Sequence, residues 1–105
     1  MRQVLAVLAI ASLSMKSQAE TTYMIQARQH AFWPQALKIP ANTKIKLTIR
    51  NEGTEAIEFE SEDFSREVVV PAQHDTVIYL GPLKPGRYAY FNDFNDQVRG
   101  RVEAE

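Results

Sequence analysis

The chain has 105 residues, which is enough for one small domain and no more. Its 12 Lys and Arg residues against 13 Asp and Glu residues leave a formal net charge of −1. No basic patch is present that could neutralise several phosphates, so the composition argues against nucleic-acid binding. The sequence contains no cysteine, which excludes disulfide staples, thiol catalysis and thiolate–metal bonds.

The first residues have the three-part pattern of a secretory signal peptide. Arg2 gives a positive start, Val4 to Leu13 is an apolar run, and Ser17 to Ala19 offers small residues at a cleavage site. The apolar run is too short to span a bilayer, which needs roughly 20 residues. We therefore predict a signal peptide over residues 1–19, a domain over residues 20–105 and export to the periplasm. A buried N-terminal helix or an uncleaved anchor is the alternative interpretation.

Short alternating segments separated by turn residues follow this leader. Lys44 to Arg50 is the clearest, because Ile45, Leu47 and Ile49 point one way and the polar residues point the other, which is the period of a half-buried strand. Further strands are expected at Thr22 to Gln29, Leu37 to Ile39, Glu55 to Glu60, Glu67 to Val70, Thr76 to Leu80, Arg87 to Phe91 and Val98 to Glu103. The pattern predicts an all-β fold of seven or eight strands, arranged as an antiparallel sandwich or barrel.

A sandwich of this size has one hydrophobic core. Burial of one aromatic ring in it contributes roughly 2–3 kcal/mol. Because the chain has no disulfides, core packing must hold the domain together alone or with help from a metal or a partner. The large side chains expected in the core are Trp33, Phe59, Tyr79, Tyr88 and Phe91.

The chain shows none of the familiar catalytic constellations, such as a GxSxG elbow, an HExxH motif or a phosphate-cradling glycine loop. Its two histidines are His30, at the end of the first expected strand, and His74, in an expected turn. On a strand, Glu58 and Glu60 project to the same face, where two carboxylates repel unless they are separated, protonated or bridged by a cation. From the residues alone, a solvent-facing edge fits these carboxylates as well as a metal site does. The stretch from Phe91 to Asp96 likewise fits either a turn or one wall of a site.

Several segments taken together resemble the cupredoxin-like family. FWPQALKIPANTKIKLTIRNEG is followed by EFESEDFSREVVVPA, then by GPLKPGRYAYFNDF and GRVEAE. The similarity is closest to the small periplasmic proteins that accompany bacterial ferrous-iron uptake permeases, and it extends from Tyr23 to Glu103. It implies an all-β, antiparallel Greek-key β-sandwich of the cupredoxin-like kind and a periplasmic location.

The resemblance also implies a metal site with His30, Glu58, Asp93 and Asn95 as its ligands. Members of that branch carry a histidine just before the first Phe-x-Pro, a glutamate in the EFES segment and an Asp-Phe-His near the end. In this chain Asn95 stands where that last histidine is expected. A blue-copper site is excluded chemically, because the chain has no thiolate and Ile57 occupies the place of the early histidine.

The cofactor implied by the resemblance is copper or iron. The implied partner is a membrane iron permease or another periplasmic component of iron uptake, with no nucleic acid and no stable membrane insertion after the leader is removed. We expect His30, Glu58 and Asp93 to converge at one pole of the sandwich. One imidazole and two carboxylates would suit Cu(II) or Fe(II) and would disfavour Cu(I), which prefers sulfur.

Three functions stay open at this point. The first, which we predict, is a metal-binding accessory of ferrous-iron uptake that also takes part in Fe(II) oxidation or electron transfer. The second is a copper-binding or copper-delivery protein without an iron role, and the third is a metal-free interaction module. Ferroxidase-type turnover is left open, with metal binding or electron transfer as the preferred role.

Overall fold

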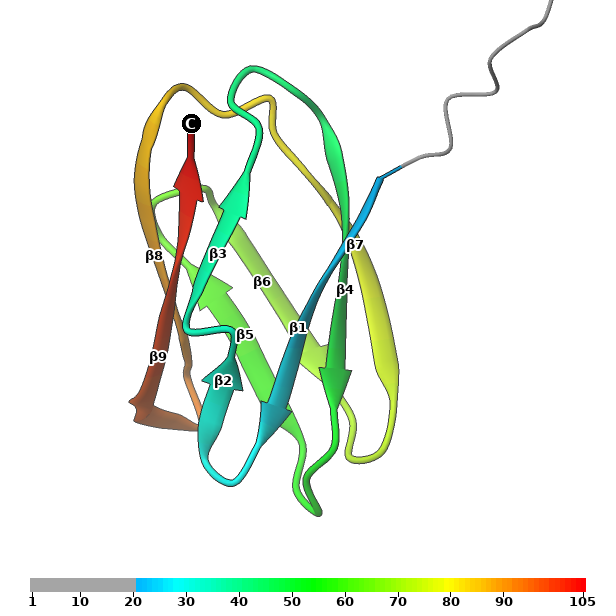
Figure 1. Cartoon of the computed structure of the whole chain (residues 1–105). Coiled ribbons are helices and arrows are strands. Elements are labelled where there is room, and N and C mark those ends of the chain that lie inside the picture. The colour runs from blue at the N-terminus through cyan, green and yellow to red at the C-terminus, as the bar shows by residue number, and fades with distance from the viewer. Residues whose placement is uncertain (1–20) are drawn as a thin grey trace, which may run out of the picture.

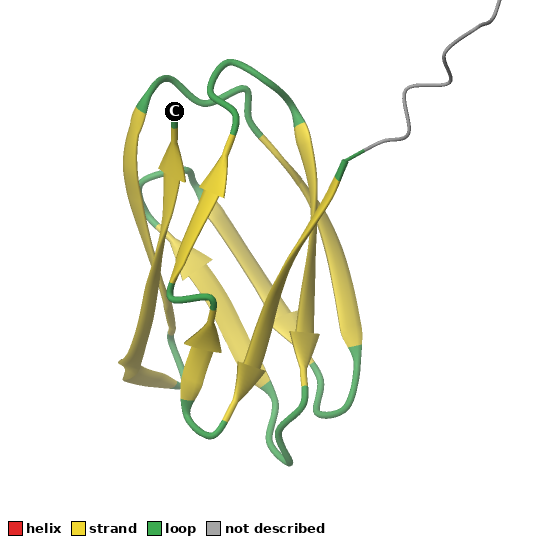
Figure 2. Cartoon of the chain, in the orientation of Figure 1, coloured by secondary structure: helices red, strands yellow, loops and turns green. Residues whose placement is uncertain are grey.

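The computed structural model describes residues 21–105, and every regular element in that range is a strand (Figure 1, Figure 2). One sheet has the strand order β2-β1-β4-β7. Its strands are β2 (Ala31–Trp33), β1 (Thr22–Arg28), β4 (Ile45–Asn51) and β7 (Asp75–Leu80). The other sheet has the order β3-β9-β8-β5-β6. Its strands are β3 (Ala36–Ile39), β9 (Asn95–Ala104), β8 (Gly86–Asn92), β5 (Ile57–Ser61) and β6 (Arg66–Val70).

The inner faces of the two sheets pack around a single hydrophobic cluster, so the predicted all-β sandwich is confirmed. No helix long and apolar enough to cross a membrane occurs in residues 21–105. The predicted signal peptide, residues 1–19, lies outside the described residues.

Two strand pairings differ from the prediction of an antiparallel sandwich. β1 runs parallel to β4, with Tyr23 opposite Leu47, and β3 runs parallel to β9, with Leu37 opposite Val102. The reason lies in the path of the chain, which leaves the first sheet after β2, adds β3 to the second sheet and then returns to place β4 beside β1. Residues 21–105 form nine strands in place of the predicted seven or eight, because the three residues of β2 are too few to show an alternating pattern.

The aromatic core is only partly the predicted one. Phe59 is fully buried, and Tyr88 and Phe91 are half-buried. Trp33 and Tyr79 were predicted wrongly, since they are 46% and 44% exposed on the outer face of the four-stranded sheet. The rings that replace them in the core are Phe32, at 2% exposed, and Tyr90, at 1%.

Strand alternation explains this exchange of rings. In β2, Phe32 faces the core, so its neighbour Trp33 must face outward, where the Arg28 guanidinium lies 5.5 Å from its ring centroid. Phe32 meets Tyr90 edge to face with ring centroids 5.1 Å apart, and Tyr90 lies 4.8 Å from Phe59. These contacts join the two sheets beneath the surface that carries the candidate site.

Candidate metal centre

β5 presents two carboxylates on the outer face of the five-stranded sheet. Ile57 and Phe59 turn inward and are buried, so Glu58 and Glu60 turn outward, where both are half-buried. The neighbouring strand β6 pairs antiparallel with β5 and sets Glu67 directly opposite Glu60. Three glutamates therefore share one patch of sheet surface.

A fourth carboxylate reaches this patch from the turn between β8 and β9. The N–H of Asp93 donates a hydrogen bond to the carbonyl oxygen of Glu58 at 2.9 Å. The N–H of Glu58 in turn donates to Oδ1 of Asn92 at 3.0 Å, and the same oxygen accepts the N–H of Phe94 at 3.1 Å. Both backbone groups of Glu58 are thus bonded to the start of the turn, which holds Asp93 over β5.

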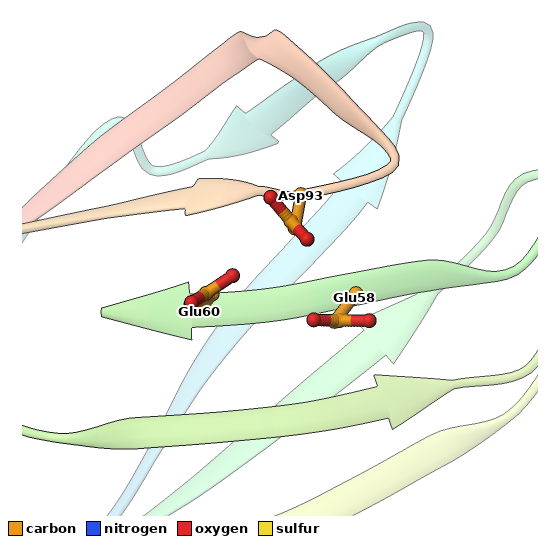
Figure 3. A group of neighbouring side chains, drawn as sticks. All are labelled: Glu58, Glu60 and Asp93. Atoms are coloured by element: carbon orange, nitrogen blue, oxygen red, sulfur yellow. The ribbon is translucent and has the colours of Figure 1, made fainter. Parts of the chain in front are cut away.

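The carboxylates of Glu58, Glu60 and Asp93 converge in space (Figure 3). One oxygen from each lies within 4.8 Å of the oxygens from the other two. In Figure 3 the two glutamates stand on β5 and Asp93 hangs from the adjoining turn towards them. We refer to these three residues as the carboxylate cluster.

The carboxylate cluster concentrates acidic side chains in one place. A hydrogen bond with the Glu67 carboxyl is the largest cause that raises the pKa of Glu58 from 4.5 to about 7, and burial and the charges of the nearby carboxylates add to it. Burial, followed by the charge of Asp93, also raises the pKa of Glu60. Within residues 21–105, none of the ion pairs to Lys or Arg involves these groups. A raised pKa means that these acidic groups disfavour further negative charge, which a bound cation would offset.

The donor set suits a hard divalent ion. Ligands on opposite sides of an ion with oxygen bonds of about 2.3–2.6 Å lie roughly 4.6–5.2 Å apart, so the observed oxygen separation is compatible with one shared ion. Carboxylate oxygens favour such ions, whereas Cu(I) favours sulfur. A blue-copper centre does not fit this chain, because it lacks the thiolate and Ile57 is a buried core residue.

The four predicted ligands fall into two places. Glu58 and Asp93 are brought together in the carboxylate cluster, while Glu60, which was not among the predicted ligands, completes it. His30 and Asn95 instead line a cavity at the adjacent pole, and neither belongs to the cluster that the described residues form. Metal binding by any of the four stays a prediction.

His30 occupies an unusual turn. It and Gln29 form the two-residue loop between β1 and β2, with φ values of 56° and 50°. Two successive residues at positive φ are typical of a type I′ turn, which favours Asn-Gly because residues with a Cβ pay about 1–2 kcal/mol there. The other histidine, His74, is exposed in a turn as predicted, with Nδ1 at 2.7 Å from the carbonyl oxygen of Ala72.

Comparison with known proteins identifies the family. The model of the cupredoxin-like domain family matches residues 2–103, and the chain belongs to that family. An uncharacterized protein of Rickettsia prowazekii (strain Madrid E), RP394, is 42% identical over 79 residues, which are 74% of this chain and 63% of the relative. The chain therefore spans less than two thirds of the length of that protein.

Several solved structures share the fold. Auracyanin B superposes with a TM-score of 0.69 at 15% identity and covers 80% of this chain and 88% of its own. The metal-binding domain of the Cu(I)-exporting P-type ATPase CopA of Streptococcus pneumoniae D39 has the same TM-score and identity, with 80% and 84% coverage. Auracyanin A, a "blue" copper protein from Chloroflexus aurantiacus, has a TM-score of 0.67 at 11% identity, with 81% and 98% coverage. These similarities confirm the cupredoxin fold.

Proposed function

We propose that this cupredoxin-like protein binds a divalent metal ion through the carboxylates of Glu58, Glu60 and Asp93. The observation that carries the proposal is the convergence of three carboxylate oxygens within 4.8 Å of one another. In the described part of the chain, none of these carboxylates forms an ion pair with Lys or Arg. A bound cation would reduce the repulsion between these acidic side chains and would lower the pKa of Glu58 towards its ordinary value.

Fe(II) is the ion that we favour. The cluster offers only oxygen donors, which suit harder divalent ions than the copper ions held by sulfur and imidazole, and the resemblance to the iron-uptake branch favours Fe(II) among such ions. The CopA domain was solved with Cu(I) and auracyanin A is a copper protein, so proteins of similar fold hold metals. Cu(II) remains the competing ion, because it binds most oxygen and nitrogen sites more tightly than Fe(II) does.

The finer proposal is that the bound ion is cargo in ferrous-iron uptake and that the protein works outside the cytoplasm, beside a membrane iron permease. The EFESEDF and LGPLKPG segments, which resemble the periplasmic iron-uptake branch, support this role, and so does the all-oxygen donor set. In the organism that carries the gene, its deletion should lower Fe(II) uptake under iron limitation. Wild-type protein should restore uptake and an Asp93→Asn variant should not.

Anaerobic equilibrium binding of Fe(II) tests the site itself. Asp93→Asn keeps the shape of the side chain and removes one charge from the cluster, so we expect affinity to fall at least tenfold. Asp96→Asn is the control, because it makes the same change at an exposed residue near the start of β9, outside the carboxylate cluster. It should leave the affinity for Fe(II) unchanged. Equal affinities of these two variants would sink the proposal.

A further inference from the structure

A cavity of about 430 Å³ opens at one pole of the sandwich, where the β1–β2 hairpin, the segment after β4 and the β8–β9 turn meet. Its floor is apolar, since Phe32, Ile57 and Val98 line it and each is 9% exposed or less. The volume lies in the range of sites for small organic molecules, about 300–1,000 Å³. The described residues that line the cavity do not include the carboxylate cluster, so the cavity is a separate feature.

Asn92 brings an unused hydrogen-bond donor to this cavity. Its side chain lines the cavity and is only 6% exposed. Its Oδ1 accepts the N–H groups of Glu58 and Phe94, which identifies the oxygen and fixes the orientation of the amide. Nδ2 of Asn92 donates none of the hydrogen bonds found in residues 21–105. Every fully buried side-chain nitrogen or oxygen in that range does have a partner. The Nδ2 group is therefore not fully buried, and Asn92 is one of the residues that line the cavity.

Asn51 lines the same cavity but offers no such donor. Its Nδ2 donates to the carbonyl oxygens of Glu55 at 2.8 Å and Val70 at 3.0 Å, and its Oδ1 accepts the N–H of Gly53 at 2.9 Å. These bonds consume both amide hydrogens and fix the wall of the cavity. Of the two buried polar side chains that line the cavity, Asn92 is therefore the one with a hydrogen-bond donor available to a ligand.

The mouth of the cavity carries an aromatic ring and negative charge. Phe94 lines the cavity and is 57% exposed, while its backbone N–H is held by Asn92, so the ring stands on a fixed turn. Such a ring can stack on a flat apolar ligand. The cavity lining has one acidic residue, Glu55, and one basic residue, Arg28, whose guanidinium lies over the Trp33 ring and keeps its charge. The three acidic residues of the nearby carboxylate cluster tip the balance to negative, which disfavours an anionic ligand.

We propose that this cavity binds a small uncharged organic molecule with a flat apolar body and one carbonyl oxygen. The oxygen accepts a hydrogen bond from Nδ2 of Asn92, and the body packs between the floor and Phe94. Asn92 also holds the turn that carries Asp93, but this site does not require a metal in the carboxylate cluster, and its test needs none.

Benzamide, benzoate and benzylamine serve as probes, because they share a ring and differ in the polar group. Titrated into the ¹⁵N-labelled protein, benzamide should shift the Asn92 side-chain NH₂ signals and the backbone amides of Ile57 and Phe94 in a saturable manner. Benzoate should bind at least tenfold more weakly because of the negative rim. Benzylamine should also bind at least tenfold more weakly, because its ammonium group cannot accept a hydrogen bond from Nδ2 of Asn92.

Two variants and a control complete the test. Asn92→Asp keeps an acceptor for both backbone N–H groups and loses the donor, so benzamide affinity should fall at least tenfold. Ala56→Phe places a ring at an exposed position of the cavity wall and should also weaken binding, without depending on the fold of the turn. Asn42→Asp, the same change at an exposed turn that does not line the cavity, should change nothing. Equal affinity for the three probes, no saturable shift, or undiminished binding by both cavity variants would overturn the proposal.

Discussion

The N–H of Asp93 donates a hydrogen bond to the carbonyl oxygen of Glu58 at 2.9 Å, and this bond sets the geometry of the carboxylate cluster. Asn92 adds the reciprocal bond from the N–H of Glu58. These two hydrogen bonds hold the turn after β8 against β5. The carboxylates of Glu58 and Asp93 therefore lie close together although they do not attract each other. The fold therefore positions like charges that would otherwise separate.

The stability of the metal-free protein should fall as pH rises. The pKa of Glu58 is raised from 4.5 to about 7 in the folded protein, so the unfolded chain loses its proton first. The stabilising contribution of this group is complete below pH 4.5 and is lost as pH rises to about 7. Denaturant unfolding between pH 4.5 and 8 measures the trend, and Glu58→Gln should flatten it. A Glu58→Gln profile that matches the wild-type profile would contradict this assignment.

Added metal should reverse that loss. At a free Fe(II) concentration about 100 times the dissociation constant, binding to the native state alone adds about 2.7 kcal/mol to the free energy of unfolding. The affinity should increase as pH rises through about 7, because the ion displaces the proton held by Glu58. Anaerobic thermal unfolding with and without Fe(II) at pH 6 and pH 8 checks both statements. A metal effect that is larger at pH 6 would contradict them.

Asn92 should matter for the cluster although it is not a ligand. Asn92→Ala leaves the N–H groups of Glu58 and Phe94 without their acceptor, which should cost about 1–3 kcal/mol of stability. The turn would loosen and Fe(II) affinity should fall as Asp93 moves away. Asn95→Ala is the control, because Asn95 is exposed and its Oδ1 accepts only the N–H of Gln97 at 3.3 Å. If Asn95→Ala lowers Fe(II) affinity as much as Asn92→Ala does, Asn95 is a ligand after all.

His30→Gly separates turn strain from metal binding. Glycine adopts the φ of 56° without a Cβ penalty, so the variant should unfold at slightly higher denaturant concentration, with a gain of about 0.5–1 kcal/mol. Fe(II) affinity should not change, because His30 lies outside the carboxylate cluster. Isothermal titration of Fe(II) and urea unfolding give the two quantities. A loss of Fe(II) affinity of tenfold or more would show that the imidazole is a ligand, as the sequence predicts.

Gly100 should tolerate no side chain. A Cβ at this position would overlap the ring and hydroxyl of Tyr90, which is buried in the core. Gly100→Ala should therefore cost about 1–3 kcal/mol through overpacking. In a double-mutant cycle with Tyr90→Leu the two effects should not add, and strict additivity in urea unfolding would contradict the overlap.

Alternation predicts most of the fold from the sequence. It places the inward residues of β4 correctly, because Ile45, Leu47 and Ile49 form an unbroken pattern of period 2. It fails at β2, where three residues cannot show whether Phe32 or Trp33 faces the core. It also cannot show the parallel pairing of β1 with β4, which depends on the crossing of the chain between the sheets.

The candidate site is predictable to a lesser degree. The shared face of Glu58 and Glu60 follows from strand geometry, whereas the approach of Asp93 was indicated only by family resemblance. The role of Glu67 escapes the sequence, because its position opposite Glu60 depends on the register of the β5–β6 hairpin. The register of the β1–β2 hairpin likewise carries His30 to the cavity instead of the cluster.

Paramagnetic broadening by Mn(II) tests the central claim most directly, because Mn(II) favours oxygen ligands and marks its own position in an NMR spectrum. At substoichiometric Mn(II), the amide signals of Glu58, Glu60 and Asp93 should disappear first, and the signal of the distant Asn42 should persist. Signals lost first around His30 and Asn95, or equally at scattered exposed carboxylates such as Glu105, would contradict a metal centre at the carboxylate cluster.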